Sequence, residues 1–162
     1  MTTRDDYTVE EWQTLLTAPA AAGLLVTTAD MSGLIGLSQE ARAVTEAATA
    51  TGVTIGGALT RALAAAIKEH KNLPVPAGLP NDRMQSRAAL IERCRQAADI
   101  VAGKAPGESE SFRRWLVAIA WRTAEAAKEG GFLGIGGMRV SEGESAAIDD
   151  LAAALGIPAG DP

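Results

Sequence analysis

The chain has 162 residues, of which 47% are hydrophobic and 22% are charged, and its formal net charge is −5. This composition excludes a fully disordered chain and a collagen-like rod. A single cysteine and a single histidine exclude an internal disulfide and a Cys/His zinc cluster, and aromatic residues, at 4%, are too few for a stacking platform on single-stranded nucleic acid.

Alanine makes up about one residue in five, and alanine is the strongest helix former. Runs of alternating or β-branched residues are nearly absent. We therefore expect an all-α fold in which residues 1–162 form one domain, a compact bundle of six or seven helices. The opening residues, MTTRDDY, lack the basic and apolar stretches of a secretory signal, so we expect a cytoplasmic protein.

Two short buried helices are predicted at the N-terminus. Thr8 and Glu11 have the spacing of a capping box, which marks the start of the first. Pro19 suits the first turn of the second, which would run to about Ala29. The stretch Trp12–Ala29 carries no charge, but its threonines, glutamine, proline and glycine are not typical of a membrane span, which needs roughly 20 strongly apolar residues.

Two further helices and a proline-containing segment are expected in the middle of the chain. Ser38 can cap a helix that begins at Gln39 and ends near residues 51–52, where a glycine follows a threonine. The next helix covers about residues 55–71. Its apolar face consists of Leu59, Leu63, Ile67 and His70. Residues 72–86 contain three prolines, and we interpret them as a possible hinge or as a boundary between two subdomains.

The C-terminal half predicts three helices. The first follows Ser86, and its apolar stripe consists of Leu90, Ile91, Cys94, Ala98 and Val101. The second, about residues 110–129, is apolar on more than one side and is expected at the centre of the bundle with both Trp115 and Trp121 buried. The third opens with a capping box at residues 141–144 and ends at Gly156, with its inward face formed by Ile148, Leu151 and Leu155.

A glycine-rich connector, GGFLGIGG at residues 130–137, precedes the last helix. A phosphate cradle is disfavoured there, because a helix precedes the loop and no Gly-Lys-Ser/Thr follows it. Two interpretations remain. The loop is a tight connector with Phe132 and Leu133 in the core, or it is an exposed apolar loop, with Ile135 included, that docks on a partner.

Basic residues are concentrated in the middle of the chain, since residues 83–122 carry eight Lys or Arg and four Asp or Glu. One interpretation is a basic surface for an acidic partner such as nucleic acid, formed by residues Arg83–Arg95 and Arg113–Arg122. The other is that these helices neutralise the acidic ends within one fold. Interleaved acids such as Glu92 and Glu110 favour the second interpretation, so no nucleic-acid partner is favoured.

Residues with catalytic chemistry are few, and each has a structural explanation. His70 near a helix C-terminus is favoured by the helix dipole, and Cys94 lies in the middle of an apolar stripe. Glu142 and Glu144 suit the first turn of a helix, and Asp149 and Asp150 suit a solvated face. We therefore assign no catalytic residue, cofactor or metal ligand.

The pattern of an Ala-Asp ending one helix, a glycine loop and a Ser-x-x-Glu-like cap opening the next resembles the tellurite-resistance TerB-like helical domains. The resemblance covers Thr27–Glu46 and, more loosely, Gly130–Leu155. It implies an all-helical fold with acidic loop residues that bind a divalent cation, here Asp30 and Glu40. The residues between these two are mostly apolar, whereas a hard cation takes about six or more oxygen ligands.

The GFLGIGG segment with its capped final helix also resembles uncharacterised bacterial proteins, which implies no activity. We therefore expect a non-catalytic bacterial helical protein that acts through protein–protein contacts or self-association, including a possible homo-oligomer. The alternative is a TerB-like, stress-associated domain that binds a divalent metal.

Overall fold

The computed structural model describes residues 4–29, 37–70, 73–129 and 140–158. Within these ranges the chain forms six α-helices, two short 3₁₀-helices and no strand, which confirms the predicted all-α bundle. The elements are, in chain order, η1 (Arg4–Asp6), α1 (Val9–Thr27), α2 (Leu37–Thr54), α3 (Ala58–His70), α4 (Arg83–Lys104), η2 (Pro106–Glu108), α5 (Ser109–Glu129) and α6 (Glu142–Leu155).

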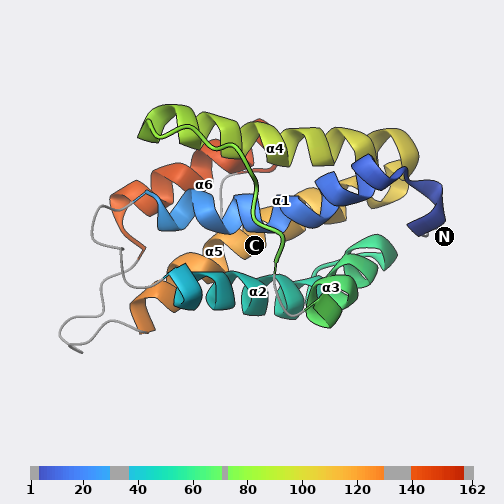
Figure 1. The fold of residues 1–162 in the computed structure, drawn as a ribbon, viewed down its shortest axis with the longest axis horizontal. Coiled ribbons are helices and arrows are strands. Elements are labelled where there is room, and N and C mark those ends of the chain that lie inside the picture. Colours follow the sequence, from blue (N-terminus) through green and yellow to red (C-terminus); the bar gives the residue numbers. More distant parts are fainter. Residues whose placement is uncertain (1–3, 30–36, 71–72, 130–139, 159–162) are drawn as a thin grey trace.

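Helices α1 and α5 form the centre of the bundle, because each of them contacts all the other α-helices. Figure 1 shows α4 and α6 above α1, with α2 and α3 below it. The central position of α5 confirms the prediction from its broad apolar surface. The largest fully buried side chains come from five helices and include Leu15, Leu25, Leu59, Leu63, Leu90, Phe112, Trp115, Ile119 and Leu151.

The N-terminal segment forms one helix, α1, where two were predicted. Its capping box is confirmed, since Glu11 N donates to Thr8 Oγ1 at 3.1 Å and Thr8 N donates to Glu11 Oε2 at 2.8 Å. The helix then continues through Pro19, although proline removes one backbone hydrogen bond. Residues on both sides of Pro19, including Leu15 and Leu25, are buried, and this burial offsets the loss. No helix in the described ranges is long and apolar enough to cross a bilayer.

Helix α2 extends to Thr54 and does not end at Thr51-Gly52 as predicted. Gly52 lies where α2 approaches α3 and α5. A Cβ atom added there would lie 2.7 Å from Ala64 Cβ and 3.3 Å from Trp115 Nε1. The glycine therefore permits close packing inside the helix and does not terminate it. The Thr51 hydroxyl, in turn, donates to Ala47 O at 2.6 Å, within the same helix.

Helix α3 begins at Ala58, three residues later than predicted, and its start is held by a distant carboxylate. Leu59 N donates to Glu108 Oε2 of η2 at 2.6 Å, so Glu108 supplies an N-terminal cap from another part of the chain. Leu63 and Ile67 are buried as predicted, together with Leu59. No local sequence signal places a residue of η2 at this helix end.

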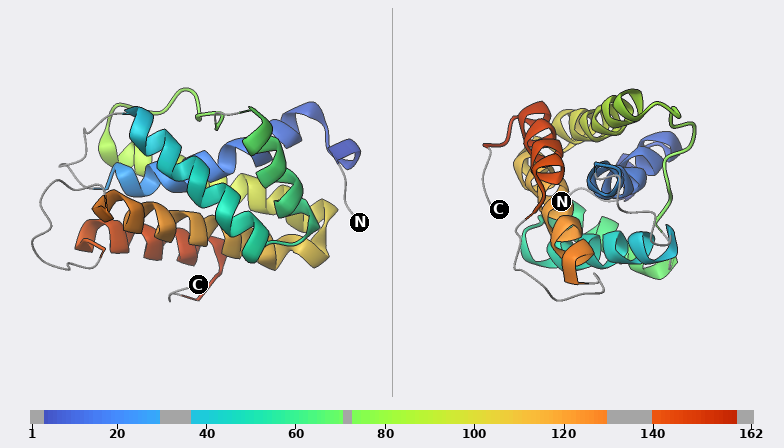
Figure 2. Two further views of the ribbon diagram at one scale, coloured as in Figure 1. Left: turned by 90° about the horizontal axis from the view of Figure 1, so that it is seen from below. Right: turned by 90° about the vertical axis from the view of Figure 1, so that its left-hand side faces the viewer.

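Helix α4 begins at Arg83, earlier than predicted, because Asp82 caps it by accepting a hydrogen bond from Gln85 N at 2.9 Å. Residues 83–86 of the interpreted hinge are therefore helical. Residues 73–82 cross the outer side of α1 on their way from α3 to α4 (Figures 1 and 2). Leu73 is buried in this segment, and Ala77 O accepts from Arg93 Nη2 at 2.8 Å, so it is attached to the bundle. A hinge motion of this segment stays a prediction.

The C-terminal helix agrees with its predicted boundaries. Ser141 and Glu144 form the capping box, with Glu144 N donating to Ser141 Oγ at 3.2 Å and Ser141 N donating to Glu144 Oε2 at 2.9 Å. Gly156 ends the helix in the left-handed conformation, with φ of 66°. The predicted inward residues are buried, namely Ile148, Leu151 and Leu155. The connector at 130–137, with Phe132, Leu133 and Ile135, lies outside the described residues.

Candidate functional site

Cys94 is fully buried in α4, where its Sγ lies 3.7 Å from Ala18 O of α1. Burial raises the pKa of its thiol to about 12, because the thiolate would lose its hydration. The thiol is therefore protonated at neutral pH and serves as a packing group between α4 and α1. His70 is the last residue of α3, and its side chain lies outside the described part of the structure.

The four carboxylates of α6 that the sequence places close together have separate roles in the structure. Glu144 is occupied as the acceptor of the α6 capping box, whereas Glu142 is exposed in the same first turn. Asp149 is exposed, and Asp150 forms an ion pair with Arg87 of α4 at 2.7 Å. Glu144 therefore caps α6, and Asp150 attaches this helix to α4.

A metal centre is not formed by the described residues, since no group of three or more His, Cys, Asp or Glu side chains among them gathers closely enough to hold an ion. Asp30 lies outside the described residues, and so does the side chain of Glu40. The divalent-cation site implied by the TerB-like resemblance therefore stays a prediction.

Most of the arginines in the basic middle of the chain have partners within the protein. Arg113 donates to Ser109 Oγ at 2.7 Å and to Leu155 O at 3.3 Å. Arg87 pairs with Asp150 near the C-terminus. The other ion pairs of these arginines within the described residues are local, joining Glu92 to Arg95, Glu110 to Arg114 and Arg122 to Glu125. These contacts support the interpretation that the basic helices neutralise the acidic ends of the chain.

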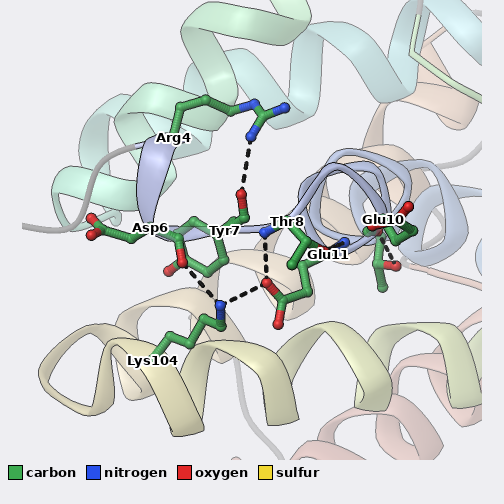
Figure 3. A network of polar contacts seen from close by, with 8 residues as sticks. Arg4, Asp6, Tyr7, Thr8, Glu10, Glu11 and Lys104 are labelled. Atoms are coloured by element: carbon green, nitrogen blue, oxygen red, sulfur yellow. Dashed lines mark hydrogen bonds and ion pairs between the residues drawn. The ribbon is translucent and has the colours of Figure 1, made fainter.

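A cluster of charged groups attaches the N-terminal residues to the end of α4 (Figure 3). Lys104 Nζ lies 2.7 Å from Glu11 Oε2 and donates to Asp6 O at 2.9 Å. The hydrogen bond from Lys104 lowers the pKa of Glu11, assisted by the backbone hydrogen bond from Thr8. The same ammonium lies 5.6 Å from the ring centroid of Tyr7. This cluster stabilises the N-terminal end of α1 against α4.

Tyr7 itself is buried beneath this cluster. Burial raises the pKa of its phenol, and the negative charge of Glu108 raises it further. Its hydroxyl is buried without a hydrogen-bond partner among the described residues. The phenol therefore stays protonated at neutral pH and acts through its ring, which lies 6.0 Å from the ring of Trp12.

A groove lies between α2 and α5 among the described residues. The two helices run in opposite directions (Figures 1 and 2). The groove has two adjoining lobes of about 270 Å³ and about 280 Å³ that share Arg122 and Glu125. The first lobe is otherwise lined by Thr51, Thr54, Ile55, Ala118 and Trp121. The second is otherwise lined by Ala43, Glu46, Ala47, Ala50 and Ala126.

The groove has a floor of small side chains and charged rims on both helices. On α2, the lining residue Glu46 pairs at 2.9 Å with Arg42, which does not line the groove. On α5, the lining residues Arg122 and Glu125 pair with each other at 3.7 Å. All four side chains are more than half exposed. Trp121 lies at one end of the groove. Its ring is only partly buried, whereas the sequence predicted that it would be buried. Its Nε1 has no hydrogen-bond partner among the described residues. No sequence pattern indicated this site, because its alanines predict only helix formation and close packing.

In comparisons with known proteins, no family model, curated protein or solved structure matches the chain. The fold and the α2–α5 groove are therefore the observations from which a function is inferred.

Proposed function

We propose that this chain is a non-catalytic helical protein that acts through protein–protein contacts, and that the α2–α5 groove is its contact surface. The observation that carries the proposal is the combination of an alanine floor with charged, exposed rims on two long helices. From the sequence we also predict that the protein is bacterial and cytoplasmic.

The shape of the groove favours a protein segment over a small molecule. Pockets for small ligands commonly have volumes of about 300–1,000 Å³ and are lined mainly by apolar and aromatic groups. The lining differs from that of such pockets, because it consists mainly of alanine, threonine and charged side chains, and Trp121 is the single aromatic residue in it. Two lobes placed end to end instead match the elongated shape that a partner helix occupies when it lies in a groove.

The floor of the groove allows such a helix to come close. Ala43, Ala47 and Ala50 are spaced three or four residues apart and so lie on one face of α2. Small side chains permit helix axes to approach to about 8 Å, the short end of the range for packed helices. Trp121 supplies a partly exposed aromatic side chain at one end, a type of residue that is enriched among the energetic anchors of protein interfaces.

A photo-crosslinking amino acid at position 50, which is exposed and lines the groove, tests this proposal in the cells that produce the protein. The matched control is position 65, an exposed alanine on α3. We expect a protein adduct from position 50 that is absent from position 65 and is lost when Ala43→Arg places a long side chain in the groove. Absence of any protein adduct at position 50 would contradict the proposed function.

A further inference from the structure

We infer that residues 73–82 form a detachable strap, which opens while the described helices stay packed and thereby uncovers one side of α1. The strap runs from the end of α3 to the start of α4 and crosses α1 near its middle (Figures 1 and 2). It includes none of the residues that line the α2–α5 groove, so this inference is independent of the proposed function.

The strap covers a side of α1 that no described helix covers. Residues 18–23 of α1 are all buried. This run is longer than one helical turn of about 3.6 residues, so no side of α1 faces water there. In Figure 1 the strap passes across the front of α1, where no helix lies, and the right-hand view of Figure 2 also places the two side by side. The strap therefore keeps this side of α1 from water.

Apolar side chains at every third position hold the strap in place. Leu73 and Pro76 are buried, and Leu79 is partly buried against the core. Between them, Val75 and Ala77 are exposed. A spacing of three residues is the period of an extended polyproline helix. The prolines of the strap also lack the N–H group that a covered backbone would have to satisfy.

Polar contacts attach the strap only weakly. Within the described ranges, no backbone group of residues 73–81 forms a hydrogen bond with another backbone group. Among the described residues, the single side-chain hydrogen bond to this stretch runs from Arg93 Nη2 to Ala77 O at 2.8 Å, and it is exposed to solvent. Segments with few hydrogen bonds and few buried side chains open at a lower free energy than the whole fold. The strap should therefore open before the helices separate.

Cysteine labelling of the folded full chain tests this opening. The variants carry Cys94→Ala, which removes the natural thiol. Leu73→Cys and Pro76→Cys then place a thiol at the two buried positions of the strap. The matched controls are Leu63→Cys on α3 and Leu90→Cys on α4, because both leucines are fully buried and lie on the two helices that the strap joins.

Both strap thiols should react with a disulfide reagent at least about a hundred-fold faster than the control thiols in the absence of urea. Below the unfolding transition, the labelling rate in the strap should hardly change with urea concentration. Local opening exposes little surface, whereas unfolding of the bundle exposes much, so only the control thiols should show the full urea dependence of global unfolding.

The hydrogen bond between Arg93 and the strap provides a second test. Arg93→Met should raise the labelling rate at positions 73 and 76 by about three- to ten-fold, because it removes the bond to Ala77 O. The matched control is Arg95→Met, which removes only a local ion pair with Glu92 on the same helix and should leave both rates unchanged.

Two results would overturn the inference. Strap thiols that react only as the bundle unfolds, with the same urea dependence as the control thiols, would show that the strap does not open separately. Control thiols that react as fast as the strap thiols would show that α3 or α4 opens together with it.

Discussion

The indole Nε1 of Trp115 in α5 donates a hydrogen bond to Ala48 O in α2 at 3.1 Å. The ring is fully buried and lies 5.9 Å from the ring of Phe112. A single side chain thus joins the bundle centre to α2, and its Nε1 lies 3.3 Å from the position that a Cβ atom on Gly52 would occupy. Trp121 in the same helix has a buried Nε1 with no partner among the described residues.

Phenylalanine at these two positions should therefore have different effects. Trp115→Phe removes buried volume and a satisfied hydrogen bond, and it should lower the free energy of unfolding by about 2 kcal/mol. Trp121→Phe removes an N–H group that has no partner, so the change should stay within about 1 kcal/mol. Urea unfolding followed by circular dichroism measures both, and equal losses would contradict the difference in hydrogen bonding.

Two helical glycines provide a second comparison. Gly52→Ala should lower the free energy of unfolding by about 1–3 kcal/mol, because its Cβ would meet Ala64 of α3 at 2.7 Å. Gly103→Ala in α4 meets nothing within 4 Å and should raise it by about 0.5–1 kcal/mol through helix propensity. Thermal unfolding of the two variants tests the prediction, and stabilisation by Gly52→Ala would show that α2 and α3 are not closely packed there.

The buried thiol of Cys94 should react with a disulfide reagent only when the protein unfolds. Near pH 8 we expect slow modification of the native protein and rapid modification in concentrated urea, where the thiol is exposed. Rapid reaction of the native chain would contradict the burial of Cys94 between α4 and α1.

The same residue predicts a loss of stability at alkaline pH. Its pKa in the folded chain is about 12, above the ordinary value of 9.0, so the unfolded chain releases this proton first. The contribution is complete below pH 9.0 and is lost as the pH rises toward about 12. Cys94→Ala should remove this part of the pH dependence, and urea unfolding of both chains across this range measures the difference.

The ion pair between Glu11 and Lys104 predicts a pH dependence at the acidic end. The pKa of Glu11 in the folded chain lies below its ordinary value of 4.5, so its contribution is complete above pH 4.5 and is lost as the pH falls through the lowered pKa. Glu11→Gln keeps the capping-box spacing but removes the ion pair. The variant should melt earlier than wild type at neutral pH, and the two melting temperatures should converge in acid.

Lys104→Met provides the complementary test. It should remove the same pH-dependent difference, and the double variant with Glu11→Gln should lose little more than either single variant, because the two residues act as one pair. Strictly additive losses would show that Glu11 and Lys104 stabilise the protein independently.

The TerB-like alternative predicts divalent-cation binding near Asp30 and Glu40. With so few oxygen ligands in that stretch, we expect calorimetric titration with Ca²⁺ or Zn²⁺ to give no saturable heat. A saturable heat that disappears in both Asp30→Asn and Glu40→Gln would instead support the metal-binding alternative.

Local sequence signals predicted the elements whose ends are set by neighbouring residues. The capping boxes at Thr8 and Ser141 and the stop at Gly156 all depend on residues within one turn of a helix end, and all are confirmed. The buried faces of α5 and α6 were also predictable, because helical periodicity places their apolar residues on the side that must leave water.

The start of α4 was missed because the local cap Asp82 was overlooked, whereas the other incorrect boundaries share one cause, which is contact with a distant segment. The helix passes through Pro19 because side chains before and after it are buried, and α2 passes through Gly52 because α3 and α5 leave no room for a larger residue. The start of α3 depends on Glu108, which is 49 positions away from Leu59. Propensity is a weak preference that such packing overrides.

The sequence alone determined that this protein is a helical bundle and, apart from residues such as Trp121, which side chains face its core, because apolar periodicity and end caps act within one helix. Only the tertiary structure decided that α2 and α5 lie against each other in opposite directions with small side chains between charged rims. A groove belongs to two helices at once, and the residues that line it are brought together by the packing of side chains such as Trp115 that lie outside it.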